Sequence, residues 1–273
     1  MLGDAQGRRQ RGAQISYRIE LGAVLLAFAL TGVVGLVRRR GDDRRAPRFG
    51  TVAALIAGIV GACLLGGCGT SSPADVPKLI QSATPGTTMA TLGTLAVKGR
   101  APKTGYARTR FGVAWADVDH NGCDTRDDVM RRDLTALRFR PSTHGCVVIS
   151  GVLADPYTGT TFDFTKAAAS KVQIDHIVAL SNAWQTGAQQ LSASTRRELA
   201  NDPLNLLAVD GPTNQQKGDG DAATWLPPRK SFRCTYVSRQ VAVKARYHLW
   251  VTPAERDAIA RVLKGCPDQP LPG

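Results

Sequence analysis

Two uninterrupted apolar runs stand near the start of the chain, at residues 21–37 and 51–67. The first has 17 residues and no charge, which is the lower end of the length that spans a membrane as a helix. The second follows a basic stretch and ends in small residues directly before Cys68, a pattern typical of an export signal. We therefore expect residues 1–67 to serve in targeting or membrane anchoring, and the water-soluble fold to begin beyond them.

Cys68 directly follows small residues, and this resembles the bacterial lipobox, in which the Cys is acylated and becomes the mature N-terminus. The sequence Gly-Thr-Ser-Ser-Pro after it suits a flexible tether. We expect lipidation at Cys68, a tether and linker over 68–99, and one domain over 100–273. The alternative is an ordinary Cys after a membrane helix. Two explanations remain for the residues before this signal. Residues 21–37 are a true first membrane span, or the start codon has been placed too early.

Beyond the tether, the spacing of apolar residues predicts a mixture of helices and strands. Residues 127–137 carry apolar side chains at helical intervals, which predicts an amphipathic helix. The turn Asp-Pro-Tyr-Thr-Gly at 155–159 lies between two apolar runs and predicts a β-hairpin with strands at 146–154 and 160–164. Further strands are expected at 172–178 and 204–209, and helices at 76–83, 182–190, 195–201, 233–247 and 253–263.

The composition is that of a folded protein with an excess of basic residues. The 273 residues are 43% hydrophobic and carry a formal net charge of +13, which excludes a fully disordered or fibrous chain. Beyond residue 67 there are 25 basic and 18 acidic residues, a net charge of +7, which suits a polyanionic partner. Solubility or attraction to an acidic envelope is the alternative explanation. No apolar span follows residue 67, which excludes a membrane-embedded transporter.

Four cysteines lie beyond the proposed processing site. An even number of cysteines in an exported domain favours disulfides, and no Cys-x-x-Cys spacing indicates zinc. Four cysteines allow three pairings. From their order along the chain and the expected compartment, we predict the disulfides Cys123–Cys146 and Cys234–Cys266.

The residues with the strongest chemical signal lie in one window, 172–221. Asp175 and His176 end a predicted strand, and Asn205 follows 29 residues after the histidine. Asn214 comes nine residues later and opens the sequence Asn-Gln-Gln-Lys-Gly-Asp. This order of residues resembles that of HNH, or His-Me finger, nucleases.

The wider pattern resembles the C-terminal nuclease domain of GmrSD-type restriction enzymes over roughly residues 100–266, through Trp-Leu-Pro-Pro at 225–228. The resemblance implies an α+β fold with a ββα-metal (HNH) core, flanking helices and a β-hairpin. It also implies a metal-dependent endonuclease that hydrolyses phosphodiester bonds of nucleic acid at the cell exterior. DNA is the expected substrate, cut with little sequence specificity.

The resemblance implies a role for each residue of the window. His176 would be the general base that takes a proton from water. Asp175 and Asn214 would ligate one divalent ion, and oxygen ligands favour Mg²⁺ or Mn²⁺. Asn205 would hold the loop that bears the base, and Lys217 would contact a phosphate oxygen.

Each of these residues has a purely structural alternative. His176 is then a buried histidine satisfied by backbone, and Asn205 a turn or strand-edge residue. Asn214 and Lys217 are then an N-cap and a solvated helix charge. Asp219 would orient Lys217, reach the ion through water or cap the turn.

A second group of acidic residues matches the start of an EF-hand calcium loop. Asp117, Asp119, Asn121 and Asp128 stand at its ligand spacing, which predicts a structural Ca²⁺. The match is incomplete, because the eighth position is Asp124 instead of an apolar residue and the last ligand is Asp instead of Glu. An Asx-rich turn that starts the next helix is the alternative.

Other aromatic and basic residues are expected to serve the fold. Trp184, Trp225 and Trp250 lie beside apolar residues and are expected to be core anchors. The pairs Arg196-Arg197 and Lys244-Arg246 are expected on solvated helix faces, with a phosphate track as the alternative.

The alternative function is a non-catalytic, envelope-binding lipoprotein module on a decayed nuclease scaffold. The presence of both His176 and Asn214 favours the nuclease. The expected partners are nucleic acid and the cell membrane, reached through the N-terminal span or a lipid anchor. The sequence does not fix an oligomeric state.

Overall fold

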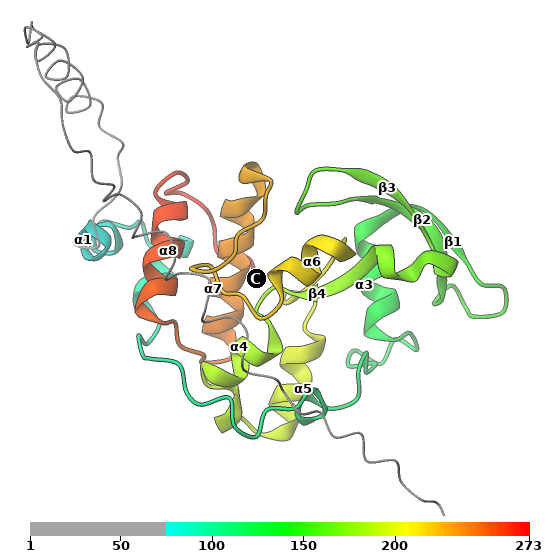
Figure 1. Cartoon of the computed structure of the whole chain (residues 1–273), viewed down its shortest axis with the longest axis horizontal. Helices are drawn as coiled ribbons and strands as arrows, with labels where there is room; N and C mark the ends of the chain where they lie inside the picture. The colour runs from blue at the N-terminus through cyan, green and yellow to red at the C-terminus, as the bar shows by residue number, and fades with distance from the viewer. Residues whose placement is uncertain (1–74) are drawn as a thin grey trace, which may run out of the picture. The chain divides into compact units, whose positions relative to one another are not determined.

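The computed structural model describes residues 75–273, so both apolar runs, Cys68 and the start of the expected tether lie outside the described residues. Within the described part, no helix is long and apolar enough to cross a membrane. The described chain is a mixture of helices and two antiparallel sheets (Figure 1). Its helices are α1 (Val76–Gln81), α2 (Thr88–Thr94), α3 (Thr125–Asp133), α4 (Leu180–Gln185), α5 (Ala193–Asn201), α6 (Gly211–Lys217), α7 (Arg233–Arg246) and α8 (Pro253–Leu263), with short 3-10 helices at η2 (Arg108–Phe111), η3 (Lys166–Lys171), η4 (Ala188–Gln190) and η5 (Lys230–Phe232).

The first sheet has three antiparallel strands in the order β1 (Leu134–Phe139), β2 (Val148–Ala154) and β3 (Thr161–Thr165). Strands β2 and β3 form the predicted hairpin. Its turn closes through a 2.8 Å hydrogen bond from Asp155 N to Thr160 O. Gly159 in this turn has φ of 82°, a conformation that favours glycine.

The predicted helix over 127–137 is wrong in its last part. Helix α3 begins at Thr125 and ends at Asp133, and the side chain of its N-cap residue Asp124 accepts a hydrogen bond from Asp127 N at 2.8 Å. The chain then continues as β1, where Leu134 lies opposite Leu153 of β2. Leu134 is buried in β1, as the helical spacing also required, so this spacing does not separate a long helix from a helix followed by a strand.

The second sheet is the antiparallel pair β4 (Val172–His176) and β5 (Leu206–Asp210). Its two faces contribute to different hydrophobic clusters: Leu206 and Ala208 pack with the β1–β3 sheet, and Leu207 and Val209 pack with α7 and α8. Burial of both faces explains why β5 is continuously apolar instead of alternating. Helix α6 follows β5 directly.

Most of the remaining predicted elements are present within two residues of their expected bounds. The expected helix at 182–190 is divided, because α4 ends at Gln185 and Gly187 adopts φ of 131° before η4. The described part of the expected tether also differs from a flexible linker. Val76, Met89 and Leu92, from α1 and α2, are buried in the same cluster as α7 and α8.

Helices α7 and α8 lie side by side, with α6 and β4 between them and the β1–β3 sheet (Figure 1). The predicted disulfide Cys234–Cys266 is present and joins the start of α7 to the segment after α8. Lys244 of α7 is not on a solvated face as expected, because its ammonium is fully buried 2.8 Å from Glu255 of α8.

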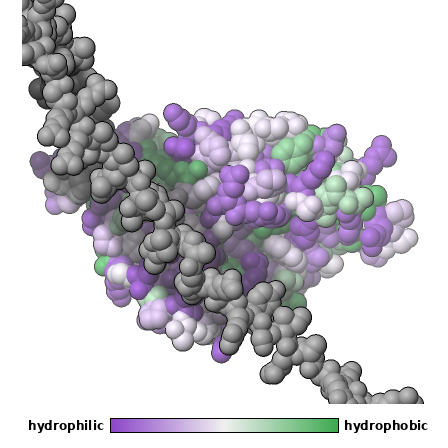
Figure 2. Space-filling view, viewed as in Figure 1, coloured by the Kyte–Doolittle hydropathy of each residue, from purple (hydrophilic) through white to green (hydrophobic). Residues whose placement is uncertain are grey.

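The other side-chain expectations concern the tryptophans. Trp184 and Trp250 are buried, each 7% exposed, and Trp225 is half-buried against the α7–α8 cluster. They are core anchors, as predicted. On the face shown in Figure 2, hydrophilic residues predominate and hydrophobic ones are scattered among them.

Candidate active site

His176 ends β4 and is 8% exposed. Its Nε2 lies 2.8 Å from the carbonyl oxygen of Ala200 in α5. A carbonyl oxygen only accepts hydrogen bonds, so Nε2 carries the hydrogen and Nδ1 of the neutral ring keeps its lone pair. The backbone therefore selects the tautomer in which Nδ1 is the basic atom.

The surroundings of His176 keep its imidazole neutral. Burial, together with the positive charges of Arg108 and Lys217, lowers its pKa from 6.5 to about 4, although the hydrogen bond to Ala200 acts in the opposite direction. The indole ring of Trp115 stacks on the imidazole, with ring centroids 6.2 Å apart and an interplanar angle of 14°. At neutral pH the ring is therefore an uncharged base held in a fixed orientation.

Lys217 does not lie at the surface, which corrects the expected phosphate contact. It is 3% exposed, and its Nζ donates hydrogen bonds to Asp175 Oδ1 at 2.9 Å and to His176 O at 2.8 Å. Helix α6 follows β5 directly and packs against β4, so its last residue reaches the end of β4. In this position the ammonium group is bound inside the protein and is not free for a phosphate.

Asp175 has a second buried partner that the sequence analysis missed. The hydroxyl of Tyr157 donates to Asp175 Oδ2 at 2.5 Å. Burial, and then the charge of Asp175, raise the pKa of Tyr157 well above its ordinary value, so the phenol stays a donor. Tyr157 belongs to the predicted turn Asp-Pro-Tyr-Thr-Gly, and only the folding of the hairpin onto β4 reveals its second role.

Asn205 is fully buried and connects the segment after His176 to α5. Its Oδ1 accepts a hydrogen bond from Val178 N at 2.8 Å, and its Nδ2 donates to Leu199 O at 3.2 Å. Leu199 adjoins Ala200, the residue that holds the imidazole. One side chain therefore fixes both the loop that follows the histidine and the helix that orients the ring.

Asn214 lies in α6 and lines a cavity of about 230 Å³ together with Gln173, Asp175, His176 and further residues. Its Nδ2 donates to Gln173 Oε1 at 2.9 Å. Within residues 75–273, its Oδ1 accepts no hydrogen bond. The amide is therefore oriented so that its oxygen remains available.

Asp219 lines the same cavity and is paired with Lys103, whose Nζ lies 2.9 Å from Asp219 Oδ2. Burial raises the pKa of the Asp219 carboxyl, but hydrogen bonds from Lys103 and Ser181 outweigh burial and hold the pKa below its ordinary value. Asp219 is therefore an ionised carboxylate at the cavity, and it contacts Lys103 instead of Lys217.

The oxygen donors at this cavity fit a hard divalent cation. Asp175 offers a carboxylate and Asn214 an amide oxygen, and both line the same space. Both oxygens of Asp175 accept one hydrogen bond, and each retains a further lone pair. Residues 75–273 contain no group of three or more His, Cys, Asp or Glu side chains arranged to hold a metal. An ion here would take most of its ligands from water and substrate, as Mg²⁺ commonly does.

A larger cavity, of about 470 Å³, lies on another side of His176. Its lining includes Arg108, Trp115 and Asn201, none of which the sequence analysis assigned to the site. Arg108 and Trp115 lie about 60 residues before the motif, in segments with no clear periodicity. Only the three-dimensional structure brings them to the histidine.

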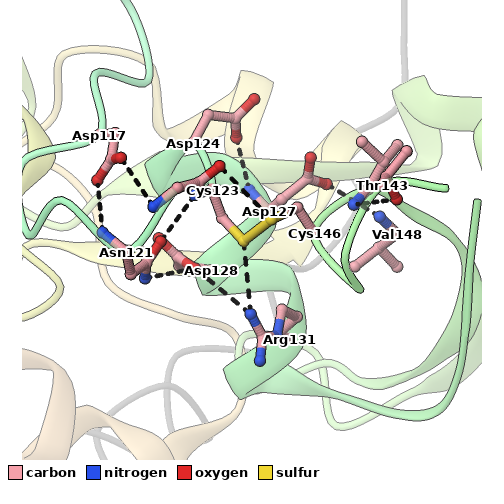
Figure 3. Close-up of a disulfide and its surroundings, with 12 residues drawn as sticks. Asp117, Asn121, Cys123, Asp124, Asp127, Asp128, Arg131, Thr143, Cys146 and Val148 are labelled. Atoms are coloured by element: carbon pink, nitrogen blue, oxygen red, sulfur yellow. Dashed lines mark hydrogen bonds and ion pairs between the residues drawn. A yellow bond between two sulfur atoms is a disulfide. The ribbon is translucent and has the colours of Figure 1, made fainter.

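Three residues of the calcium-like loop, Asp117, Asn121 and Asp128, lie beside the predicted disulfide Cys123–Cys146, which is present (Figure 3). Asn121 Nδ2 donates to Asp119 Oδ2 at 3.0 Å and to Asp128 Oδ1 at 3.2 Å, and Asn121 N donates to Asp117 Oδ1 at 3.2 Å. The carboxylates are thus held together by hydrogen bonds from Asn121. Calcium binding stays a prediction.

Comparisons with known proteins place this site in context. Residues 124–262, just over half of the chain, match the sequence model of the family described as GmrSD restriction endonucleases, C-terminal domain. The chain is also 40% identical over 199 residues to a protein of Arthroderma benhamiae described as an uncharacterized secreted protein; the match covers 72% of this chain and 92% of that protein. No solved structure matches the chain. The matched region contains β4, β5, α6 and every residue of the candidate site from Tyr157 to Asp219.

Proposed function

The chain belongs to the family of GmrSD restriction endonuclease C-terminal domains, and we propose that it is a metal-dependent endonuclease that hydrolyses phosphodiester bonds of nucleic acid. The observation that carries the proposal is the state of His176. It is a neutral imidazole with Nε2–H bound to Ala200 O, next to a cavity lined by the oxygen donors Asp175 and Asn214.

In the proposed reaction, His176 Nδ1 takes a proton from the water that attacks phosphorus. The low pKa of the free ring means that it is unprotonated and ready before the substrate binds. A bound phosphate brings negative charge close to the ring, which favours the imidazolium form and makes Nδ1 a stronger base in the complex. The carbonyl of Ala200 accepts the Nε2 hydrogen throughout, so proton uptake does not require the ring to turn.

Asp175 and Asn214 would hold one divalent ion, which supplies charge stabilisation to the phosphoryl and leaving oxygens. Lys217 and Tyr157 keep the Asp175 carboxylate in a single orientation through one hydrogen bond each. In this proposal Lys217 is a positioning residue. The groups assigned to the reaction contact phosphate and water and not the bases, so we infer cutting with little sequence specificity. We propose DNA as the substrate.

We propose that the enzyme acts outside the cytoplasm. The export-like segment before Cys68 and the two disulfides support this location, and a relative of 40% identity is described as secreted. Attachment to the membrane through residues 21–37 or through acylated Cys68 is part of the same proposal.

The test uses the full-length protein, purified in mild detergent with its disulfides oxidised. Supercoiled plasmid, single-stranded DNA and RNA are incubated with Mg²⁺ or Mn²⁺, and in parallel with EDTA. We expect cleavage of DNA that depends on the divalent ion. If all three substrates stay intact with a folded protein in both metals, the nuclease assignment fails and a non-catalytic binding module takes its place.

A further inference from the structure

The cavity of about 470 Å³ beside His176 is not used by the proposed reaction. Its volume is in the range of small-molecule binding sites. It is lined largely by apolar groups, among them Phe111, Val113 and Trp115. Val113 is 77% exposed. The cavity therefore offers an apolar and aromatic surface that opens to solvent directly beside the candidate base.

Trp115 is held in this wall in an unusual conformation. Its φ is 60°, which is rare for a bulky residue and costs free energy unless the surroundings enforce it. The indole is partly buried against the cluster around the β1–β3 sheet, and it stacks on His176. The fold thus fixes an aromatic plane at the cavity.

Asn201 supplies a polar group with an unused acceptor. The residue lines the cavity and is 1% exposed. Its Nδ2 donates to Arg197 O at 2.8 Å, whereas its Oδ1 is buried and has no hydrogen-bond partner. A buried carbonyl oxygen without a partner is costly, and a rotation of the Asn201 amide toward the cavity would bring it within reach of a ligand N–H group.

Two basic residues lie at the same cavity. Arg108 lines both this cavity and the smaller one that holds Asp175 and Asn214. The side chain of Arg197 in α5 lies against Gly112 in the cavity wall. Arg108 and Arg197 therefore place two basic side chains beside an aromatic cavity, the combination by which proteins hold single-stranded nucleic acid.

We propose that this cavity binds the nucleobase of a nucleotide next to the cleaved phosphate. The base stacks on Trp115, Arg108 contacts the phosphate between the two cavities, and Asn201 turns its amide oxygen toward an N–H of the base. This inference rests on the proposed function and narrows its substrate. A paired base cannot enter a side pocket without leaving its stack, so the site favours single-stranded or locally opened nucleic acid.

The test is equilibrium binding in EDTA, where no metal-dependent cleavage takes place. The full-length protein is titrated against a short fluorescent oligodeoxythymidylate and against an abasic oligomer of the same length and charge. Wild type should bind the thymidylate about tenfold more tightly, the usual effect of stacking one base on an aromatic side chain. The Trp115→Ala variant should lose this preference and keep its affinity for the abasic oligomer, and Trp115→Phe should keep most of the preference.

A second variant covers the case in which Trp115→Ala does not fold. Ala114 is exposed and lines the cavity, so Ala114→Leu fills space without removing a core contact and should also lose the preference. Equal binding of both oligomers by wild type, or a preference that survives in Ala114→Leu and in any folded Trp115→Ala, overturns the proposal. Cleavage of the same thymidylate in Mg²⁺ is measured in parallel. If the protein cleaves the oligomer but shows no base preference in binding, only the base-binding proposal fails. If it shows the base preference but no cleavage, only the nuclease proposal fails.

Discussion

Lys217 Nζ lies 2.9 Å from Asp175 Oδ1, and both side chains are buried, with exposed fractions of 0% and 6%. The pair joins the last residue of α6 to a carboxylate near the end of β4. The positive charge of Lys217 therefore compensates the buried negative charge of Asp175. The ion pair therefore couples the stability of the strand–helix unit to the orientation of Asp175.

Replacing Lys217 should destabilise the protein strongly. Lys217→Met leaves the Asp175 carboxylate buried with Tyr157 as its sole remaining hydrogen-bond donor among the described residues, which typically costs about 3–5 kcal/mol. Urea unfolding measures the loss. The matched control is Lys103→Met, which breaks the exposed pair with Asp219 and should have a much smaller effect. Equal losses in the two variants would show that the buried pair has no special role.

The pKa of His176 predicts how stability depends on pH. The folded protein takes up this proton near pH 4 and the unfolded chain near pH 6.5, so between these values the unfolded state binds more protons. The free energy of unfolding should therefore fall by up to about 3 kcal/mol as the pH drops from 6.5 to 4. Urea unfolding of wild type and His176→Gln measures it. His176→Gln should show a flatter dependence, and the exposed-residue control His144→Asn should not; an unchanged slope in His176→Gln contradicts the prediction.

The sequence predicted which residues of the motif come together better than it predicted the partners of each residue. His176, Asn205 and Asn214 were singled out by order and spacing, and the structure brings them to the β4–β5–α6 region. Their neighbours were not predictable, because contacts such as Tyr157 with Asp175 join segments whose approach depends on how the hairpin packs. A charged helix residue such as Lys217 is usually solvated, and only the fold shows that it is buried.

Asn205→Ala should affect both stability and rate. The variant loses the acceptor for Val178 N and the donor to Leu199 O, and an unsatisfied buried donor typically costs about 1–3 kcal/mol. Because these bonds fix the loop and the helix around His176, the cleavage rate should fall even at temperatures where the variant is folded. Thermal unfolding and the initial rate of plasmid nicking are the measurements. A folded variant with wild-type rate would show that Asn205 serves the fold alone.

The disulfide Cys234–Cys266 should contribute substantially to stability. It closes a loop of 32 residues, for which loop entropy predicts about 3–4 kcal/mol. The double variant Cys234→Ser, Cys266→Ser is compared with wild type by urea unfolding under non-reducing conditions. The same comparison for Cys123–Cys146, with a separation of 23 residues, should give a slightly smaller loss. A double variant as stable as wild type contradicts the prediction.

The secondary structure was predictable where the local pattern and the tertiary packing agree. The helix at 253–263 combines a capping box of Thr252 and Glu255, a proline at its first position and apolar residues at helical spacing, and its bounds are as expected. Residues 134–137 also have helical spacing, but they pair with strand β2 and form part of β1. The larger cavity beside His176 was also not predictable. Residues 108–115 show no periodicity, and they come to line the cavity only because η2 packs against α5.

The central claim is that His176 is the general base of a metal-dependent nuclease. The most direct measurement is the rate of supercoiled-plasmid nicking by wild type and by His176→Ala, expressed and purified in parallel, with Mg²⁺ and with EDTA. The account predicts nicking by wild type in Mg²⁺, none in EDTA, and a rate in His176→Ala that is lower by roughly 10²–10⁴-fold. A folded His176→Ala protein that nicks plasmid at the wild-type rate would contradict it.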